Sequence, residues 1–343
     1  MSVVHRVRLP IGAVPLVEVG HRVEPAEVLA TRRPPGEGRS IAVAAPLRRS
    51  PASGEACVLV RPGTMVEAGE ALARQGGREV RAPADALYLG YDPVDGSALV
   101  APLLGTEPIV GHVRGEVASV SDEAIEIRAS GAMVAGVAGS GGAVHGELRL
   151  AVHDPADELR ATAIDVGTTG RILVGGSRAS AETLTRARAM GVAGIVLGGV
   201  LDKELRDFEA TQRRRRETAG EVGDLPILLL EGFGKVGLDP EVFAWFRAHH
   251  GHVASLFGDS AELYVYDATP PPARRALPRP GDRVMAHRRP YAGLSGDLLR
   301  VLPGLHATAA GTTARSGVVR FDDGLTAVVP LANLEAVDRA PGG

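Results

Sequence analysis

The stretch VEVGHRVEPAEVLA at residues 17–30 returns as VRPGTMVEAGEALA at residues 60–73. Seven positions agree at a fixed offset of 43 residues, which identifies an internal repeat. Each copy predicts a strand, a glycine turn, a valine that points inward and a second short strand, because its apolar positions alternate on either side of the turn. The repeat therefore indicates that the first hundred or so residues are built from short strands and tight turns.

Each copy of the repeat is followed by an Ala-Pro pair, at Ala45-Pro46 and at Ala82-Pro83, and an Asp-Gly turn comes later at residues 92–96. This arrangement resembles the barrel-sandwich hybrid of biotinyl and lipoyl carrier domains, and a similar hybrid opens a subunit of the Rnf electron-transport complex. The resemblance covers residues 10–105 and implies a rigid β-module, so we expect such a domain over residues 1–105.

Carrier domains of that kind present a modified lysine at a hairpin tip. Residues 1–202 contain no lysine, since Lys203 and Lys235 are the only two in the chain. Covalent biotin or lipoate is therefore excluded. Two interpretations stay open: a module that docks a partner, and a module that holds a ligand without a covalent bond.

Length and composition limit the possible classes of protein. A chain of 343 residues predicts two to four domains. The net charge of −3 gives no support to bulk electrostatic binding of nucleic acid or of an anionic membrane. No run reaches about 18 apolar residues, so we expect no membrane span. Residues 1–15 lack the apolar run of a signal peptide, and Cys57 is the only cysteine, so we expect a reducing, cytoplasmic location.

Residues 106–160 are predicted to be a β extension, because apolar and polar residues alternate at 110–117 and 124–127. The glycine-rich run at residues 136–142 invites comparison with a phosphate-binding loop. Such a loop needs a helix whose N-terminus faces the phosphate, whereas this run leads into another expected strand at residues 144–150. We therefore expect a turn or loop there.

The periodicity changes within residues 161–265, where a small parallel α/β domain is predicted. The expected elements are strands at 171–174, 193–197 and 226–230, helices at 181–190, 202–218 and about 240–249, and a further strand at 253–256. Strands that alternate with helices favour a parallel sheet. The segment resembles swivelling domains and protease-associated domains, a likeness of fold that implies no function.

The carboxyl ends of parallel strands are where ligands bind in open sheets of this kind. Three of the expected strands end in glycines, and the first also faces the N-terminus of a helix, which favours an anion. The candidate ligand-binding residues are Gly175, Gly176, Ser177, Gly198, Gly199, Glu231, Gly232 and Gly234. Glycines after strands are also ordinary turn formers where backbones crowd. Both interpretations stay open.

Other clusters give weaker signals. His249 and His252 have the spacing of a shared metal, yet no further ligand follows at a familiar spacing, so we expect an exposed helix end and no metal site. The four arginines at residues 213–216 are expected to lie at a solvated helix end. The chain has no nucleophile or zinc-protease motif, so no catalytic residue and no cofactor are assigned.

The C-terminal part begins after a proline-rich linker at residues 266–280. Residues 281–338 open with Gly-Asp-x-Val, place Asp323-Gly324 between two alternating runs, and close with Val-Pro-x-x-Asn-Leu-Glu. The Asp-Gly pair predicts a hairpin. The segment resembles a KOW-type, SH3-like barrel, a domain that contacts RNA or protein in ribosomal proteins and NusG-type factors. The resemblance makes Arg283, Arg288, Arg289 and Tyr291 candidates for contact with nucleic acid.

Together these observations predict a multidomain chain of α/β and all-β parts: a barrel-sandwich hybrid, a small parallel α/β domain and an SH3-like barrel. The leading hypothesis is a non-catalytic binding or scaffold protein with a protein partner. One alternative is an RNA- or ribosome-associated protein that acts through the C-terminal barrel. The other is an enzyme or sensor that uses the glycine-rich strand ends.

Overall fold

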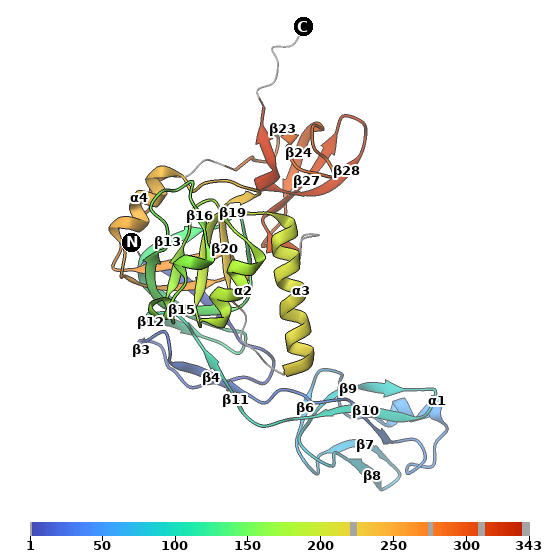
Figure 1. Ribbon diagram of the computed structural model, residues 1–343. Helices are drawn as coiled ribbons and strands as arrows, with labels where there is room; N and C mark the ends of the chain where they lie inside the picture. The colour runs from blue at the N-terminus through green and yellow to red at the C-terminus, as the bar shows by residue number, and fades with distance from the viewer. Residues whose placement is uncertain (1, 220–224, 274–276, 308–312, 338–343) are drawn as a thin grey trace.

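The computed structural model describes residues 2–219, 225–273, 277–307 and 313–337 (Figure 1). Most of the regular structure is β-strand, in one large mixed sheet and several small sheets. Figure 1 shows an elongated molecule, with a small β-module at one end, a C-terminal β-unit at the other and the large sheet between them. No helix in the described ranges is long and apolar enough to cross a membrane.

The chain begins with a β-unit, here called the N-terminal unit. Its strands are β1 (Ser2–Arg8), β2 (Val14–Pro15), β3 (Arg22–Val23), β4 (Val28–Arg32), β11 (Glu107–Val110), β12 (Gly115–Val120) and the long strand β13 (Ala124–Ala135). One layer has the order β1-β13-β12-β3 and the other has the order β11-β4-β2. They share a core that includes Leu29, Ile125 and Ile127. The far end of β13 continues into the large sheet, where it pairs with β22 (Glu262–Tyr266).

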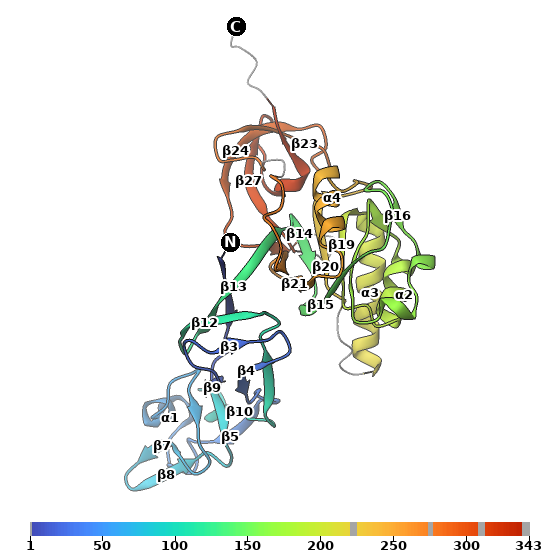
Figure 2. The same ribbon diagram turned by 90° about the vertical axis from the view of Figure 1, so that its left-hand side faces the viewer.

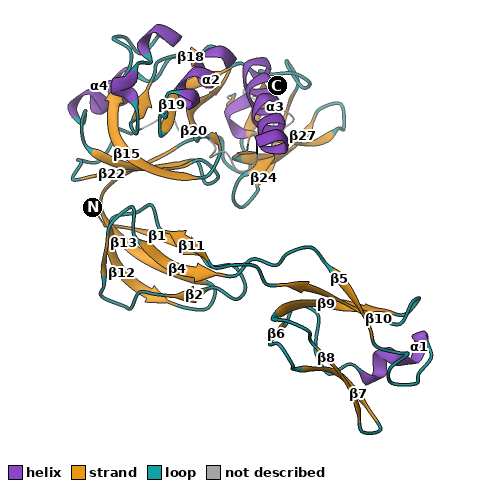
Figure 3. Ribbon diagram, turned by 60° about the horizontal axis from the view of Figure 1, so that its bottom comes forward, coloured by secondary structure: helices purple, strands orange, loops and turns teal. Residues whose placement is uncertain are grey.

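A second β-structure, here called the projecting module, lies between β4 and β11 in the chain and spans residues 34–103 (Figures 1 and 3). Its elements are β5 (Arg39–Ala42), α1 (Pro51–Gly54), a 3-10 turn (Glu55–Cys57), β6 (Met65–Val66), β7 (Ala71–Gln75), β8 (Arg78–Arg81), β9 (Ala86–Asp92) and β10 (Ser97–Pro102). A core of its own includes Val43, Leu72 and Tyr88.

The two copies of the sequence repeat fold alike, but they lie in different cores. Gly20 and Gly63 adopt φ values of 88° and 87°. In each copy a glutamate carboxylate accepts a hydrogen bond from the backbone N–H three residues earlier, at 3.1 Å for Glu24 to Glu27 and 2.9 Å for Glu67 to Glu70. The first copy packs in the N-terminal unit and the second in the projecting module. The specific likeness to carrier domains stays a prediction.

The middle of the chain forms the centre of the large sheet. Its elements are β14 (Ala138–Ser140), β15 (Ala143–Leu150), β16 (Glu158–Leu159), β17 (Ile172–Val174), β18 (Arg178–Ala179), α2 (Ala181–Ala189), β19 (Gly194–Val200), α3 (Asp202–Ala219), β20 (Ile227–Phe233), α4 (Pro240–Ala248), β21 (Val253–Phe257) and β22, with 3-10 turns at Ala161–Ala163 and Val166–Thr168. Helices α2 and α3 pack on one face and α4 on the other.

The parallel strands predicted from the sequence are present, but they belong to a larger mixed sheet. β15, β17, β19 and β20 run parallel in that spatial order. β14 joins one side in antiparallel fashion, and β21, β22 and β13 continue the other side in the same way. The expected further strand at 253–256 is β21. The run at residues 136–142 is partly strand β14, where a loop or turn was expected, because Ala138–Ser140 pair with β20.

The C-terminal unit contains β23 (Arg283–Ala286), β24 (Ser295–Val301), β27 (Ser316–Phe321), β28 (Thr326–Pro330), a 3-10 turn (Leu331–Asn333) and β29 (Leu334–Ala336). The hairpin predicted at Asp323-Gly324 is confirmed by the pairing of β27 with β28. The strand order is the open path β28-β27-β24-β23-β29, and the described strands form no closed barrel. Two further strands, β25 (His306–Ala307) and β26 (Thr313–Ala314), join the large sheet through β14.

Candidate functional site

The glycines predicted to hold a ligand lie where separate backbone segments cross. Gly176 follows β17, and a Cβ on it would overlap the carbonyl oxygen of Asp157. Ser177 is buried, and its backbone N–H donates to that same oxygen at 2.7 Å. Gly175 faces the side chains of Leu159 and Leu197. The segment before β16 therefore covers this strand end.

The other strand ends are covered in the same way. Gly198 and Gly199 lie within β19, and Cβ atoms on them would overlap the backbone of residues 234–238. An ideal Cβ on Gly232 would lie 3.1 Å from the Cβ of Ala332 in the C-terminal unit. Glu231 accepts a long hydrogen bond from the N–H of Asp239, at 3.5 Å. The structure brings the eight residues to one edge of the sheet. Close approach of backbone accounts for Gly176, Gly198 and Gly199, whereas side chains lie against Gly175, Gly232 and Gly234.

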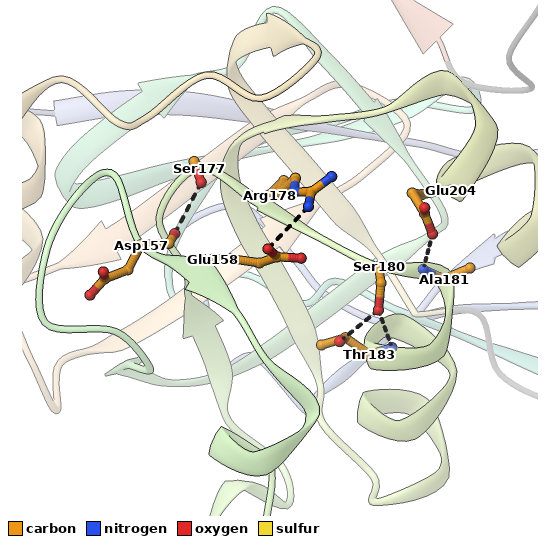
Figure 4. Close-up of polar contacts among 8 residues, drawn as sticks. All are labelled: Asp157, Glu158, Ser177, Arg178, Ser180, Ala181, Thr183 and Glu204. Atoms are coloured by element: carbon orange, nitrogen blue, oxygen red, sulfur yellow. Dashed lines mark hydrogen bonds and ion pairs between the residues drawn. The ribbon is translucent and has the colours of Figure 1, made fainter.

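The N-terminus of α2, which was expected to favour an anion, already has a carboxylate from the chain (Figure 4). Oε2 of Glu204 in α3 accepts a hydrogen bond from the N–H of Ala181 at 2.7 Å. Ser180 caps the helix by accepting from the N–H of Thr183 at 3.1 Å. A small-molecule site at these strand ends stays a prediction, and the observed packing does not add to its support.

The arginines of the C-terminal unit have different surroundings. Arg283 forms ion pairs with Asp322 and Asp297, and its guanidinium lowers the pKa of Asp322. Tyr291 stacks on Phe321 with ring centroids 5.3 Å apart, and it is partly buried against the core of this unit. The Arg288 guanidinium lies against Gly234, and Arg289 is exposed. Only the two latter arginines retain the free surface that contact with a nucleic acid requires.

The histidines considered for a metal are engaged in hydrogen bonds. His249 ends α4 and is buried, where an exposed helix end was expected. Its Nδ1 lies 2.8 Å from the carbonyl oxygen of Trp245, and its Nε2 accepts from the N–H of Thr269 at 3.2 Å. His252 bonds to the carbonyl oxygen of Tyr266. The described residues contain no group of three or more potential ligands for a metal. Of the arginines at 213–216, three have side chains outside the described set.

One cavity in the described structure was not anticipated from the sequence. It is a groove of about 1170 Å³ between the N-terminal unit, the β21–β22 hairpin and the C-terminal unit. Residues Val4–Arg8 of β1 form one wall, Phe257 and Tyr264 contribute to the second, and residues 301–305 form the third. We call it the β1 groove. In the view of Figure 2, the N-terminus, where β1 starts, projects just below the C-terminal unit.

His5 and Tyr264 are both buried titratable groups of this groove. His5 is 8% exposed, stacks on Phe257 with ring centroids 4.1 Å apart, and meets Tyr264 edge to face. Burial lowers the pKa of His5 from 6.5 to about 4, so the ring is neutral at physiological pH. Burial and the nearby Glu262 raise the pKa of Tyr264. The alternating segment at residues 2–8 is the one sequence signal that would have identified the strand.

Comparison with known proteins adds no family to this description. No model of a known protein family matches the chain, and no curated protein matches it in sequence.

Proposed function

We propose that this chain is a non-catalytic binding protein that docks a partner protein on its projecting module. The observation that carries the proposal is the insertion of the module into a hairpin. β4 and β11, which lead into and out of the module, pair with each other in antiparallel register, with Thr31 opposite Pro108. A folded unit presented on paired strands, away from the large sheet, suits recognition by a second protein (Figures 1 and 3).

The attachment of the module is ordered at its base. The N–H of Gly36 donates to the carbonyl oxygen of Pro102 at 2.8 Å, and the N–H of Leu104 donates to Pro34 at 2.8 Å. Arg33 reaches into the module and binds the carboxylate of Asp85 at 2.5 Å. These contacts hold the segment that enters the module beside the segment that leaves it. The module is therefore attached through two segments that are hydrogen-bonded to each other.

The module carries exposed apolar side chains close to this base. Leu89 on β9 and Leu99 on β10 are 41% and 40% exposed, and both lie within 4 Å of an ideal Cβ on Gly38. Leu104, which directly follows the module in the chain and is 53% exposed, lies against Gly36 in the same way. We call these three leucines the leucine patch. Contiguous apolar surface on a soluble domain is typical of protein interaction sites.

The other two hypotheses have less support from the geometry. Backbone or side chains of the chain itself lie close to all six strand-end glycines, which weakens the case for an enzyme or sensor that uses them. Arg283 pairs with two aspartates and Tyr291 is partly buried against the core, so these two candidates offer less free surface to a nucleic acid than the sequence suggested. RNA association stays a proposal that rests on Arg288 and Arg289.

Affinity purification with quantitative mass spectrometry tests the proposal in cells that express the chain. The bait variants are the wild type, the double variant Leu89→Ser/Leu99→Ser, and Val94→Ser as a control. Val94 is 86% exposed on the same module, so its replacement removes an apolar side chain outside the patch. We expect a protein that is enriched by the wild type and by Val94→Ser and is lost from the double variant.

A further bait lacks the module altogether. Residues 36–102 are replaced by Asn-Gly, because Pro35 and Leu103 lie opposite each other and a two-residue Asn-Gly loop suits such a hairpin. This variant should stay folded and lose the same partner. Enrichment of one set of proteins by all four baits would refute docking on the module. Enrichment of RNA that depends on Arg288 and Arg289 would favour the alternative function.

A further inference from the structure

Strand β1 has one edge that no described strand covers. β1 pairs with β13 along its whole length, from Ser2 opposite Ser130 to Arg8 opposite Ala124. No described strand pairs with its other edge. An unpaired edge presents a row of backbone donors and acceptors that a further strand can use.

The direction of those backbone groups follows from the pairing. The N–H of Leu9 donates to the carbonyl oxygen of Glu123 at 2.7 Å, one step beyond the strand. Because hydrogen-bonded and non-hydrogen-bonded pairs alternate in an antiparallel ladder, His5 and Val7 also bond to β13. The N–H and C=O groups of Val4, Arg6 and Arg8 then point to the open edge.

This edge faces the β1 groove, since Val4–Arg8 form its first wall. A strand rises about 3.4 Å per residue, so seven residues offer a pairing length of roughly 24 Å. His5 lines the groove and is 8% exposed. Its ring nitrogens are not among the buried polar atoms that lack a partner, so they reach the surface of the groove, where the ring offers a donor and an acceptor.

The charges on β1 itself indicate the kind of ligand, whereas Asp259 and Glu262 line the groove away from this strand. Arg6 and Arg8 are two residues apart and therefore lie on the same side of the strand, and both are exposed. The pair between Arg6 and Glu123 is long, at 3.9 Å, and its side chains are 57% and 87% exposed, so it is weak. The described residues contain no ion pair of Arg8. Carboxylates at alternate positions of an added strand would lie opposite these guanidinium groups.

We propose that β1 binds an extended peptide segment with acidic side chains at alternate positions, as an added strand in the β1 groove. The carboxylates pair with Arg6 and Arg8, and the peptide backbone bonds to Val4, Arg6 and Arg8. Recognition of an extended peptide at a sheet edge uses main-chain hydrogen bonds for affinity and alternate side chains for specificity. This site is separate from the leucine patch of the projecting module.

Exposed arginines on an edge strand can also serve to prevent unwanted pairing. Fluorescence anisotropy with defined peptides separates the two roles. The probe is a fluorescein-labelled peptide of nine residues that alternates glutamate and valine, and the control peptide alternates lysine and valine. We expect saturable binding of the acidic peptide to the full-length chain, weakened by salt, and at least tenfold weaker binding of the basic peptide.

Two variants at one position test whether the backbone takes part. Arg6→Ala removes the guanidinium and keeps the outward N–H, so the affinity should fall by about twofold to fivefold. Arg6→Pro also removes that N–H, which does not bond to β13. The affinity for the peptide should therefore fall by a further factor of about five. Melting temperatures of the two variants should be similar. Equal affinities of the two variants for the acidic peptide would overturn the proposal.

Amide exchange measured by NMR on the wild-type chain provides a second readout that does not depend on variants. Saturation with the acidic peptide should slow exchange at Val4, Arg6 and Arg8 and leave His5 and Val7 unchanged, since the latter already bond to β13. No binding of the acidic peptide, or equal binding of the basic one, would refute the proposal. So would a dimer in light scattering that Arg6→Pro dissociates, because the edge would then bind a second copy of this chain.

Discussion

The backbone N–H of Ala181, at the start of α2, donates to Oε2 of Glu204 in α3 at 2.7 Å (Figure 4). A carboxylate from one helix thus occupies the positive end of its neighbour, where an external anion would otherwise bind. Ser180 satisfies a second donor of the same turn. The helix N-terminus that the sequence predicted to favour an anion is therefore occupied by a carboxylate of the chain itself.

Replacement of Glu204 tests this arrangement. Glu204→Ala should lower the free energy of unfolding by about 1 kcal/mol, since a helix-capping acceptor is lost. Sulfate should then raise the melting temperature of Glu204→Ala more than that of the wild type, because the N–H of Ala181 becomes available. Glu204→Gln keeps an acceptor and is the control. Equal responses of the three proteins to sulfate would show that the carboxylate does not block an anion.

The strand-end glycines give a second prediction. Gly176→Ala should destabilise the fold by more than 2 kcal/mol, since its Cβ would overlap the carbonyl oxygen of Asp157 and the backbone would have to move. Gly142→Ala is the matched control, because nothing lies within 4 Å of an ideal Cβ on Gly142 and its φ is not in the left-handed region. Urea denaturation of both variants measures the difference. A harmless Gly176→Ala would remove the packing explanation and revive a ligand role for this glycine.

The repeat leads to a third prediction, about additivity. Gly20 and Gly63 have φ values of 88° and 87°, and nothing lies within 4 Å of an ideal Cβ on either. Alanine at each position should therefore cost only the strain of a left-handed backbone, about 1 kcal/mol. The two costs should add in the double variant, because the copies lie in different cores. A coupling above about 0.5 kcal/mol in the double variant would mean that the two copies share one folding core.

Much of the local structure could be predicted because it depends on short-range signals. The glycine turns of the repeat, the helix at residues 181–189 and the hairpin at Asp323-Gly324 follow from turn chemistry, capping and periodicity. The parallel strands around residues 172–174 followed from their alternation with helices.

The sequence could not show which distant strands pair. β14 and β26 lie side by side although more than 170 residues separate them, and β13 joins two sheets with one continuous strand. The β1 groove also escaped prediction, because it is formed by three segments that meet only in the folded chain. His5, Phe257 and residues 301–305 carry no motif that links them. Such a site depends on tertiary packing, which periodicity does not report.

The burial of His5 predicts how the stability of the protein depends on pH. Its pKa is lowered from 6.5 to about 4 in the folded state, so between these values the unfolded chain binds a proton that the folded chain does not. Above pH 6.5 the contribution of His5 to the free energy of unfolding should not change with pH. As the pH is lowered toward 4, this contribution should reduce the free energy of unfolding by roughly 3 kcal/mol in total. His5→Phe keeps an aromatic ring on Phe257 and should lose this pH dependence. The comparison is made between pH 6.5 and 5, because carboxylates with lowered pKa values, such as Asp85, titrate below this range. Urea denaturation at several pH values measures the difference between the two proteins. If the free energies of unfolding of the wild type and of His5→Phe depend on pH in the same way, His5 takes up its proton in the folded state. Its ring would then be accessible to water in the groove.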